Sequence, residues 1–159
     1  MQSEDANDLS WLLERFATDV AGVTNVLLLS TDGFVIARAH MREEDAERCS
    51  AALCGIAALC EAFGNALGVS ASEGMRSTKQ VLIEKDSYSV FVTRVGRGLP
   101  EGHLRRGADP STVGTILGVI VEPKADIGGV AYAATQLNSS LAEHLCTAAR
   151  GSDAVAPGR

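Results

Sequence analysis

The chain has 159 residues, a length that suits one domain with a hydrophobic core that needs neither disulfides nor metal. Hydrophobic residues make up 46% and charged residues 21% of the chain, which is an ordinary soluble globular composition. The formal net charge is −6, and no basic stretch is interleaved with aromatics. Because phosphate binding needs clustered Lys and Arg, this composition argues against nucleic acid or an anionic membrane as the main partner.

The beginning of the chain, MQSEDANDLS, is acidic and polar, without the basic start and apolar run of a secretory signal. We therefore expect a cytoplasmic protein with reduced cysteines. The cysteine spacing contains no C-x-x-C-like pair and fits no zinc pattern. The sequence thus predicts buried structural thiols and no metal or other cofactor; the four cysteines are Cys49, Cys54, Cys60 and Cys146.

The first elements are a helix and a hairpin. Apolar residues at helical spacing predict an amphipathic helix over residues 9–20, preceded by a disordered N-terminus at 1–8. Two β-rich runs around an Asp32-Gly33 turn then predict a β-hairpin, in which Gly33 supplies a positive φ. The first run contains VLLL, four successive apolar residues, which calls for helices on both faces of the sheet.

The rest of the chain alternates between the same two patterns. A second helix is expected over residues 41–68, and two strands around a KDS turn within 77–95. A long loop without periodicity follows at 96–114. The run TILGVIVE predicts a fifth strand and residues 124–150 a last helix, so that one domain spans 9–148 and a disordered tail 149–159. The predicted fold class is an α/β (α+β) sandwich of order α-β-β-α-β-β-β-α, a five-stranded, mainly antiparallel sheet with helices on both faces.

The second predicted helix is apolar all round, which indicates burial all round. One side carries a stripe of larger residues that should pack on the sheet: Cys49, Leu53, Ile56, Cys60, Phe63 and Leu67. The opposite side carries a row of small residues: Ala51, Gly55, Ala58, Ala62 and Ala66. Low Leu, Ile and Phe content argues against insertion into a membrane. Alanine tolerates water, so the small row could be exposed; its lack of Lys, Glu and Arg favours a homodimer interface between two copies of this helix.

Catalytic motifs are missing from the sequence. It has neither a G-x-x-x-x-G-K-[ST] phosphate loop nor a G-x-S-x-G elbow, and its three histidines have no neighbours that suggest a nucleophile or metal pair. We therefore expect no enzymatic activity. Three arginines in the long loop, if the loop is not simply solvated, could contact an acidic partner or a phosphate: Arg97, Arg105 and Arg106.

The order of these segments resembles the Roadblock / dynein-light-chain domain, most closely the bacterial form of conservon-type operons. The resemblance covers residues 9–148 and is carried by LSWLLERFATDVAGVTNVLLLSTDGFVIA, the Ala-rich helix, QVLIEKDSYSVFVTRV and ADIGGVAYAATQL. Its most specific parts are the S-x-D-G hairpin and the DIGGVAY helix start. The loop at 96–114 looks longer than is usual for this family.

The resemblance implies a small α/β sandwich that forms homodimers through the central helix and the edge strand after it, giving a continuous ten-stranded sheet. It implies a non-enzymatic regulator or scaffold of a small Ras-like GTPase, similar to the gliding-motility GTPase regulator of bacteria. Conservon operons pair such a subunit with a sensor-kinase-like membrane protein and a small GTPase, so the chain could be recruited to the membrane by a partner. The alternatives are a small-molecule sensor domain, with a ligand between sheet and helix, and an enzyme with a dispersed site.

Overall fold

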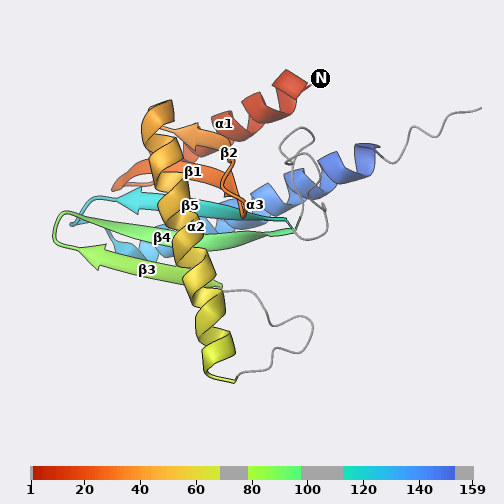
Figure 1. The fold of residues 1–159 in the computed structure, drawn as a ribbon. Helices are drawn as coiled ribbons and strands as arrows, with labels where there is room; N and C mark the ends of the chain where they lie inside the picture. The colour runs from red at the N-terminus through yellow and green to blue at the C-terminus, as the bar shows by residue number, and fades with distance from the viewer. Residues whose placement is uncertain (1, 69–78, 98–112, 153–159) are drawn as a thin grey trace, which may run out of the picture.

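Three helices and five strands make up the computed structural model of the chain (Figure 1), which describes residues 2–68, 79–97 and 113–152. The elements are, in chain order, α1 (Gln2–Asp19), β1 (Val23–Ser30), β2 (Val35–Ala39), α2 (Glu43–Ala66), β3 (Gln80–Lys85), β4 (Tyr88–Arg97), β5 (Gly114–Val121) and α3 (Ile127–Ser152). The strands form one sheet of order β2-β1-β5-β4-β3, in which every neighbouring pair is antiparallel. The predicted fold class and element order are confirmed.

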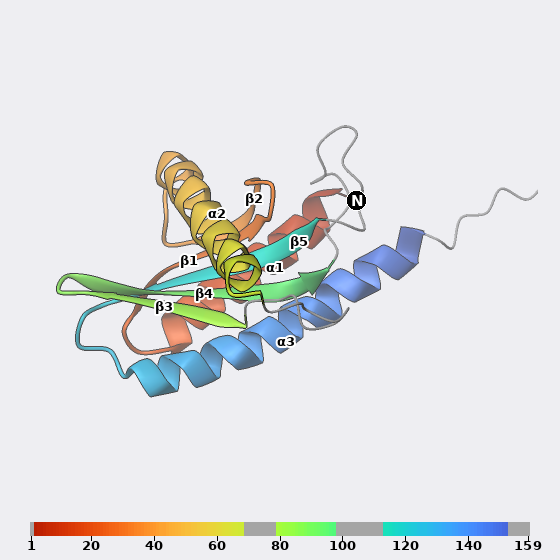
Figure 2. The ribbon, with the colours of Figure 1, turned by 60° about the horizontal axis from the view of Figure 1, so that its bottom comes forward.

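The sheet separates two layers of helices (Figure 2), with α1 and α3 on one face and α2 on the other. The strand β1 lies between β2 and β5, and its residues Val26 to Leu29 are completely buried. Because side chains alternate along a strand, Val26 and Leu28 enter the core beneath α1 and α3, while Leu27 and Leu29 enter the core beneath α2. The run VLLL is thus covered on both faces, as predicted.

The β1–β2 hairpin turns at the predicted Asp32-Gly33 pair. Gly33 has a φ of +96°, a conformation that costs glycine little and other residues more. The Ser30 N–H donates to the Phe34 carbonyl over 2.8 Å, and the Phe34 N–H donates to the Ser30 hydroxyl oxygen over 3.0 Å. That hydroxyl also hydrogen-bonds the Asp32 carboxylate. These bonds inside the turn fix the position of β2 at the edge of the sheet.

The layer formed by α1 and α3 closes one face of the sheet. The apolar stripe predicted for the last helix is buried along its whole length: Val130, Ala134, Leu137, Leu141 and Leu145. From α1, Leu9, Leu13 and Phe16 join the same core. Residues of both helices join one core, and among the described residues this face holds the larger of the two cores.

Two predicted boundaries differ from the structure. The helix α1 begins at Gln2, not at residue 9, so the prediction of a disordered N-terminus at 1–8 was wrong from Gln2 onward. No apolar residues at helical spacing precede Leu9, so periodicity did not reveal the first turns of this helix. At the other end α3 continues to Ser152, past the predicted start of the tail at 149. Residues 98–112 of the predicted loop and 153–159 of the tail lie outside the described residues.

Candidate functional site

The helix α2 is longer than the sheet beneath it is wide. Its 24 residues span about 36 Å at 1.5 Å per residue. The five strands lie about 4.8 Å apart, so the two outer strands are separated by only about 19 Å. Figure 1 shows α2 crossing the strands, starting near β2 and ending beyond β3. The last turns of α2 therefore have no sheet of their own to cover.

This overhang corrects the prediction that the whole stripe of larger residues packs on the sheet. In the first half of α2, Leu53 is buried with 5% of its surface exposed, and Cys49 and Ile56 pack against the same core. In the second half, Phe63 is 68% and Leu67 is 73% exposed. The helical wheel predicts only the direction of a side chain around the helix, and the sheet ends before it reaches these two residues.

A second set of exposed residues lies beside the overhang. All five residues of the predicted small row are exposed: Ala51, Gly55, Ala58, Ala62 and Ala66. Leu59, which is 63% exposed, lies between this row and Phe63 around the helix. We call the small row together with Leu59, Phe63 and Leu67 the α2 apolar face. At about 100° per residue it covers about half the circumference of the helix.

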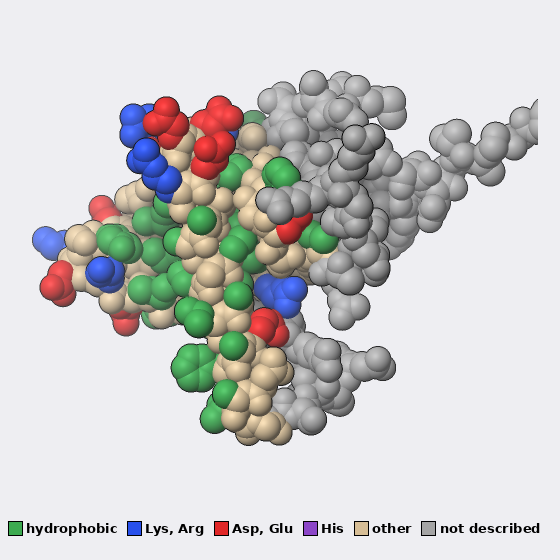
Figure 3. Space-filling model, in the orientation of Figure 1, with side chains coloured by type: hydrophobic (Ala, Val, Ile, Leu, Met, Phe, Trp, Pro, Cys, Tyr) green, Lys and Arg blue, Asp and Glu red, His purple; other side chains and the backbone are tan. Residues whose placement is uncertain are grey.

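The surface view agrees with this reading (Figure 3). Hydrophobic side chains gather along α2 and on the sheet beside it, whereas charged side chains gather at the N-terminal end of the helix. Those charges include Glu43, Glu44 and Asp45 in the first turn, where the helix dipole favours them. In the most apolar 18-residue stretch of α2, only 11% of the residues are buried. An exposed apolar surface of this kind is typical of protein interaction sites.

By length and composition α2 alone, among the helices of the described residues, would be able to cross a membrane. Its packing assigns it to the folded domain, because Ala46 and Leu53 are buried on the sheet. The end of the helix is also fixed by the chain itself: Gly68 has a φ of +64°, and its N–H donates to the Asn65 carbonyl over 3.2 Å. The helix thus ends close to residue 68, where the sequence predicted its end.

Close contacts hold α2 in place on its inner side. A Cβ built on Gly118 of β5 would lie 2.6 Å from Leu53 Cδ1, so the glycine permits the helix to approach the sheet. The Ser50 hydroxyl donates to the Gly33 carbonyl over 3.2 Å. Nearer the end of the helix, Arg94 Nη1 of β4 lies 3.2 Å from Glu61 Oε1. These contacts fix the orientation of α2, and hence the direction in which its apolar face points.

The cysteines of α2 are free thiols that line its inner half. Cys49, Cys54 and Cys60 are each half-buried, and the Cys54 thiol contacts the Ser30 carbonyl at 3.6 Å. Burial raises the pKa of the Cys49 and Cys54 thiols, and the nearby carboxylates of Asp45 and Asp32, respectively, raise it further. A raised pKa makes a thiol less reactive, which fits a packing role. The side chain of Cys146 lies outside the described part of α3.

The strand β3 adds an open backbone edge next to the overhang. It pairs only with β4, and its other side has no strand partner among the described residues. Unpaired N–H and C=O groups along an edge strand are a template for another strand. The C-terminal end of α2 and β3 lie at the same side of the molecule (Figure 1). Residue patterns predicted the small row here, and the family resemblance implied the edge strand, but the exposure of Phe63 and Leu67 was not predicted because the pattern does not show that α2 is longer than the sheet is wide.

The space between α2 and the sheet is too small for most ligands. A cavity of about 150 Å³ lies there, lined among others by Cys54, Ala57 and Arg94. Ligand-binding pockets typically measure about 300–1,000 Å³. This size disfavours the alternative of a small-molecule sensor with its ligand between sheet and helix.

The other candidate residues do not form a site in the described part of the chain. Arg97 ends β4, but its side chain lies outside the described residues, as do Arg105 and Arg106 entirely. His40 and His144 are exposed and lie on different elements. Within residues 2–68, 79–97 and 113–152, no three His, Cys, Asp or Glu side chains come together in a way that could hold a metal ion.

The sequence model of the Roadblock/LC7 domain matches residues 9–99, more than half of the chain. The chain belongs to the Roadblock/LC7 family. Members of this family are generally regulatory or adaptor proteins. The match ends shortly after β4, while the structure extends the family fold through β5 and α3.

Solved structures agree with this assignment. A Roadblock/LC7 domain from Streptomyces avermitilis is 25% identical, with a TM-score of 0.69, over 86% of this chain and 97% of that chain. The protein MglB of Myxococcus xanthus is 16% identical with a TM-score of 0.65, over 88% of this chain and 89% of that chain. The gliding protein MglB of Thermus thermophilus is 15% identical with a TM-score of 0.66, over 89% of this chain and 91% of that chain. No curated protein matches the sequence.

Proposed function

We propose that this protein is a homodimeric adaptor that binds and regulates a small Ras-like GTPase. The observation that supports this proposal is the α2 apolar face, which lies uncovered beside the open edge of β3 in a chain of a family of regulators and adaptors. One of the similar structures is an MglB with a tetrameric arrangement, so assembly occurs on this fold. The family resemblance supports the choice of a small Ras-like GTPase as the partner and the proposed mode of dimerisation.

In the proposed dimer a two-fold axis brings the two β3 edges together and lays the two α2 helices side by side. The ten strands then form one continuous sheet. Phe63 and Leu67, which extend beyond their own sheet, would cover the sheet of the partner. The small row would let the two helix backbones approach closely. Full burial of a Leu or Phe side chain stabilises by about 1.5–3 kcal/mol, so each of these residues can contribute a large share of that on association.

The adaptor acts by shape and contact. It needs no cofactor and performs no chemistry of its own, and its partners are proteins, not nucleic acid. We place it in the cytoplasm, from where a sensor-kinase-like membrane protein of the same conservon-type operon would recruit it to the membrane. Arg97, Arg105 and Arg106 stay candidates for a contact with that partner or with the GTPase.

Ala58→Glu tests the interface. Ala58 lies in the middle of the small row, so two like charges would be desolvated next to each other in the dimer. We expect a cost of about 3–5 kcal/mol per dimer, which raises the dimer dissociation constant at least a hundredfold. The matched control is Gln136→Glu, which adds the same charge at an exposed position of α3. If both variants keep the wild-type mass in solution, the α2 apolar face is not the interface.

The GTPase is tested by mixing the purified protein with the Ras-like GTPase encoded nearest to its gene, loaded with GDP or with a non-hydrolysable GTP analogue. We expect a complex on size exclusion with light scattering that prefers one nucleotide form, and a changed rate of GTP hydrolysis or nucleotide exchange. If the wild-type protein is a stable dimer but binds neither nucleotide form of the GTPase, the proposal of GTPase regulation is overturned and only that of a dimeric scaffold stands.

A further inference from the structure

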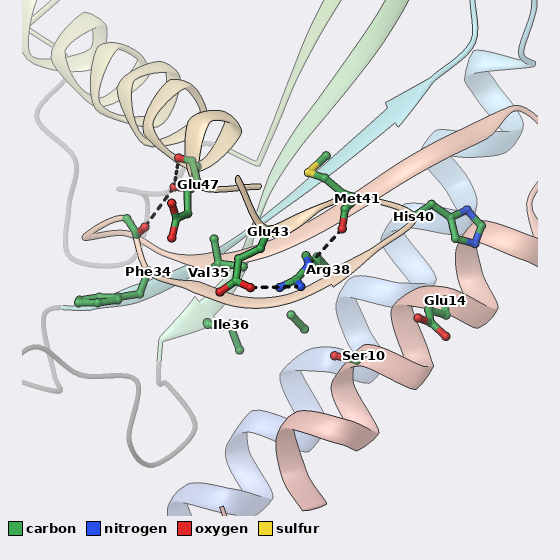
Figure 4. A pocket seen from close by; sticks show the side chains of 13 residues that line it. Ser10, Glu14, Phe34, Val35, Ile36, Arg38, His40, Met41, Glu43 and Glu47 are labelled. Atoms are coloured by element: carbon green, nitrogen blue, oxygen red, sulfur yellow. Dashed lines mark hydrogen bonds and ion pairs between the residues drawn. The ribbon is translucent and has the colours of Figure 1, made fainter. Parts of the chain in front are cut away.

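The other edge of the sheet, formed by β2, carries a groove that the proposed function does not use. The groove has a volume of about 760 Å³ and follows the end of the hairpin turn and β2, from Gly33 to Arg38. One wall is α1, with Ser10 and Glu14, and the other is the start of α2, with Glu43 and Glu47 (Figure 4). If two copies join through β3, the two β2 edges lie at the far ends of the shared sheet and stay open.

We propose that this groove binds an extended, basic segment of a partner polypeptide, which adds to β2 as an antiparallel or parallel sixth strand. The proposal does not depend on GTPase regulation or on dimerisation. Strand addition to an open edge supplies main-chain hydrogen bonds for affinity and side-chain contacts for specificity. Two observations support it here, the direction of the β2 backbone and the charge of the groove.

The backbone direction follows from the hydrogen bonds of the hairpin. The Ser30 N–H donates to Phe34 in the direction of β2, whereas the Thr31 N–H donates to Gly114 in the direction of β5, each over 2.8 Å. Because successive residues of a strand face opposite neighbours, Leu27 faces β5. Arg38 lies directly opposite Leu27, so its own N–H and C=O point away from β1 and toward the groove. A partner strand would bond to Arg38 first.

The start of the open edge is marked by an aromatic side chain. Phe34, 41% exposed, stands at the hairpin end of β2 and can contact an apolar side chain of the added strand. At the other end His40 has a φ of +55°, and its carbonyl accepts a hydrogen bond from Asn25 Nδ2 over 2.5 Å. The strand thus ends in a fixed position. Its five residues extend at most about 17 Å, because the register between β1 and β2 shifts by one residue between Leu28 and Leu29, and this length limits the segment that can pair.

The negative charge of the groove favours a basic occupant. Three glutamates stand on its walls against one arginine. The Arg38 guanidinium already has partners within the chain, since its Nη2 lies 3.8 Å from the Glu43 carboxylate and its Nε donates to the Met41 carbonyl over 3.1 Å. Glu14 and Glu47 have no ion-pair partner in the described part of the chain. Lysine or arginine side chains of an added strand could pair with them.

The same charge argues against a second copy of this chain as the occupant. Pairing of two β2 edges would bring the glutamates of both grooves together, and like charges at an interface oppose association. The net charge of −6 of the whole chain acts in the same direction. A basic partner segment is therefore the occupant that the groove fits.

The test titrates the ¹⁵N-labelled full chain with two synthetic probes, acetyl-KTKVKTK-amide and acetyl-ETEVETE-amide. Binding is measured by the changes in the amide chemical shifts of the protein. We expect the lysine probe to bind at least about tenfold more tightly than the glutamate probe, with the largest shifts along β2 and a loss of affinity with salt. Glu14→Lys with Glu47→Lys should reverse the preference. Equal affinities, or shifts confined to α2 and β3, would overturn the proposal.

A backbone variant separates strand addition from simple charge attraction. Arg38→Pro removes an N–H that is not bonded to β1, and edge strands accept proline at such positions. We expect it to lose binding of the lysine probe, whereas the control Arg38→Ala, which keeps the N–H, binds at least as well as the wild type. If Arg38→Pro does not fold, the charge-reversal pair decides. Retained binding by folded Arg38→Pro would exclude strand addition. Assembly of the wild type beyond a dimer that is lost in Arg38→Pro would make a second copy the occupant and overturn the proposal of a basic partner segment.

Discussion

The two faces of the sheet are covered by helices to different degrees. Beneath α1 and α3, twenty buried residues form one core, whereas beneath α2 only six do so among the described residues. The central strand β1 contributes equally to both faces, with Val26 and Leu28 in one core and Leu27 and Leu29 in the other. The difference lies in the helices: two cover one face, and one that is longer than the sheet is wide crosses the other. The first face is covered along its helices, whereas the second leaves apolar surface of α2 exposed in the single chain.

The largest effect is expected on the two-helix face. Leu141 of α3 is completely buried, so Leu141→Ala should lower the free energy of unfolding by about 3 kcal/mol through lost contacts and an unfilled cavity. The change is measured by urea unfolding at fixed protein concentration. Tyr132→Ala on the same helix is the control, because Tyr132 is 70% exposed and its removal should change the free energy by less than about 0.5 kcal/mol. Equal effects of the two would mean that this face is not a packed core.

On the α2 side the expected effect is smaller and moves from folding to association. Phe63→Ala should leave monomer stability nearly unchanged and weaken the dimer by about 1–2 kcal/mol per protomer, since the ring is exposed in the monomer and would be buried in the dimer. Sedimentation equilibrium measures the dissociation constant. Tyr132→Ala again serves as the control, and should leave that constant unchanged. A drop in monomer stability without any change in association would place Phe63 in the protomer's own core.

The ion pair that orients α2 should contribute less still. Arg94 and Glu61 are 30% and 42% exposed, so Glu61→Gln is expected to cost at most about 1 kcal/mol of unfolding free energy, and less at high salt. The pair Arg15–Asp19 on α1, with both side chains 63% exposed, is the control, and Asp19→Asn should cost close to nothing. A cost of several kcal/mol for Glu61→Gln would mean that this pair, and not Leu53 on Gly118, holds α2 on the sheet.

The smallest effect concerns the half-buried thiols. Burial raises the pKa of Cys49 and Cys54, so both should react more slowly with iodoacetamide in the folded protein than after unfolding, and faster as the pH rises. The folded state keeps these protons to a higher pH than the unfolded state does. Their contribution to stability is therefore present below the ordinary thiol pKa and is lost as the pH rises above it. Mass spectrometry of labelled peptides gives the rates; equal rates in both states would show that these thiols are solvated.

Periodicity along the chain was enough to predict the fold, because each side chain of a strand or helix has a direction that its neighbours determine. The run VLLL required two covered faces, and the stripe ending at Leu145 required one packed helix face. Periodicity has no information on where a neighbouring element ends, so Phe63 and Leu67 were assigned to a sheet that does not extend beneath them. The groove at β2 was missed for a related reason: Glu14, Arg38 and Glu47 come from three elements that only the folded chain brings together.

The mass of the wild-type protein in dilute solution tests the central claim most directly. Sedimentation at micromolar concentration, with a reducing agent present so that no disulfide can contribute, should give twice the 16.6 kDa of one chain. Ala58→Glu under the same conditions should give a single chain, or an aggregate if the exposed helix cannot stand alone. A wild-type protein that sediments as a folded monomer would contradict the account, because the α2 apolar face would then be stable in water without a second copy.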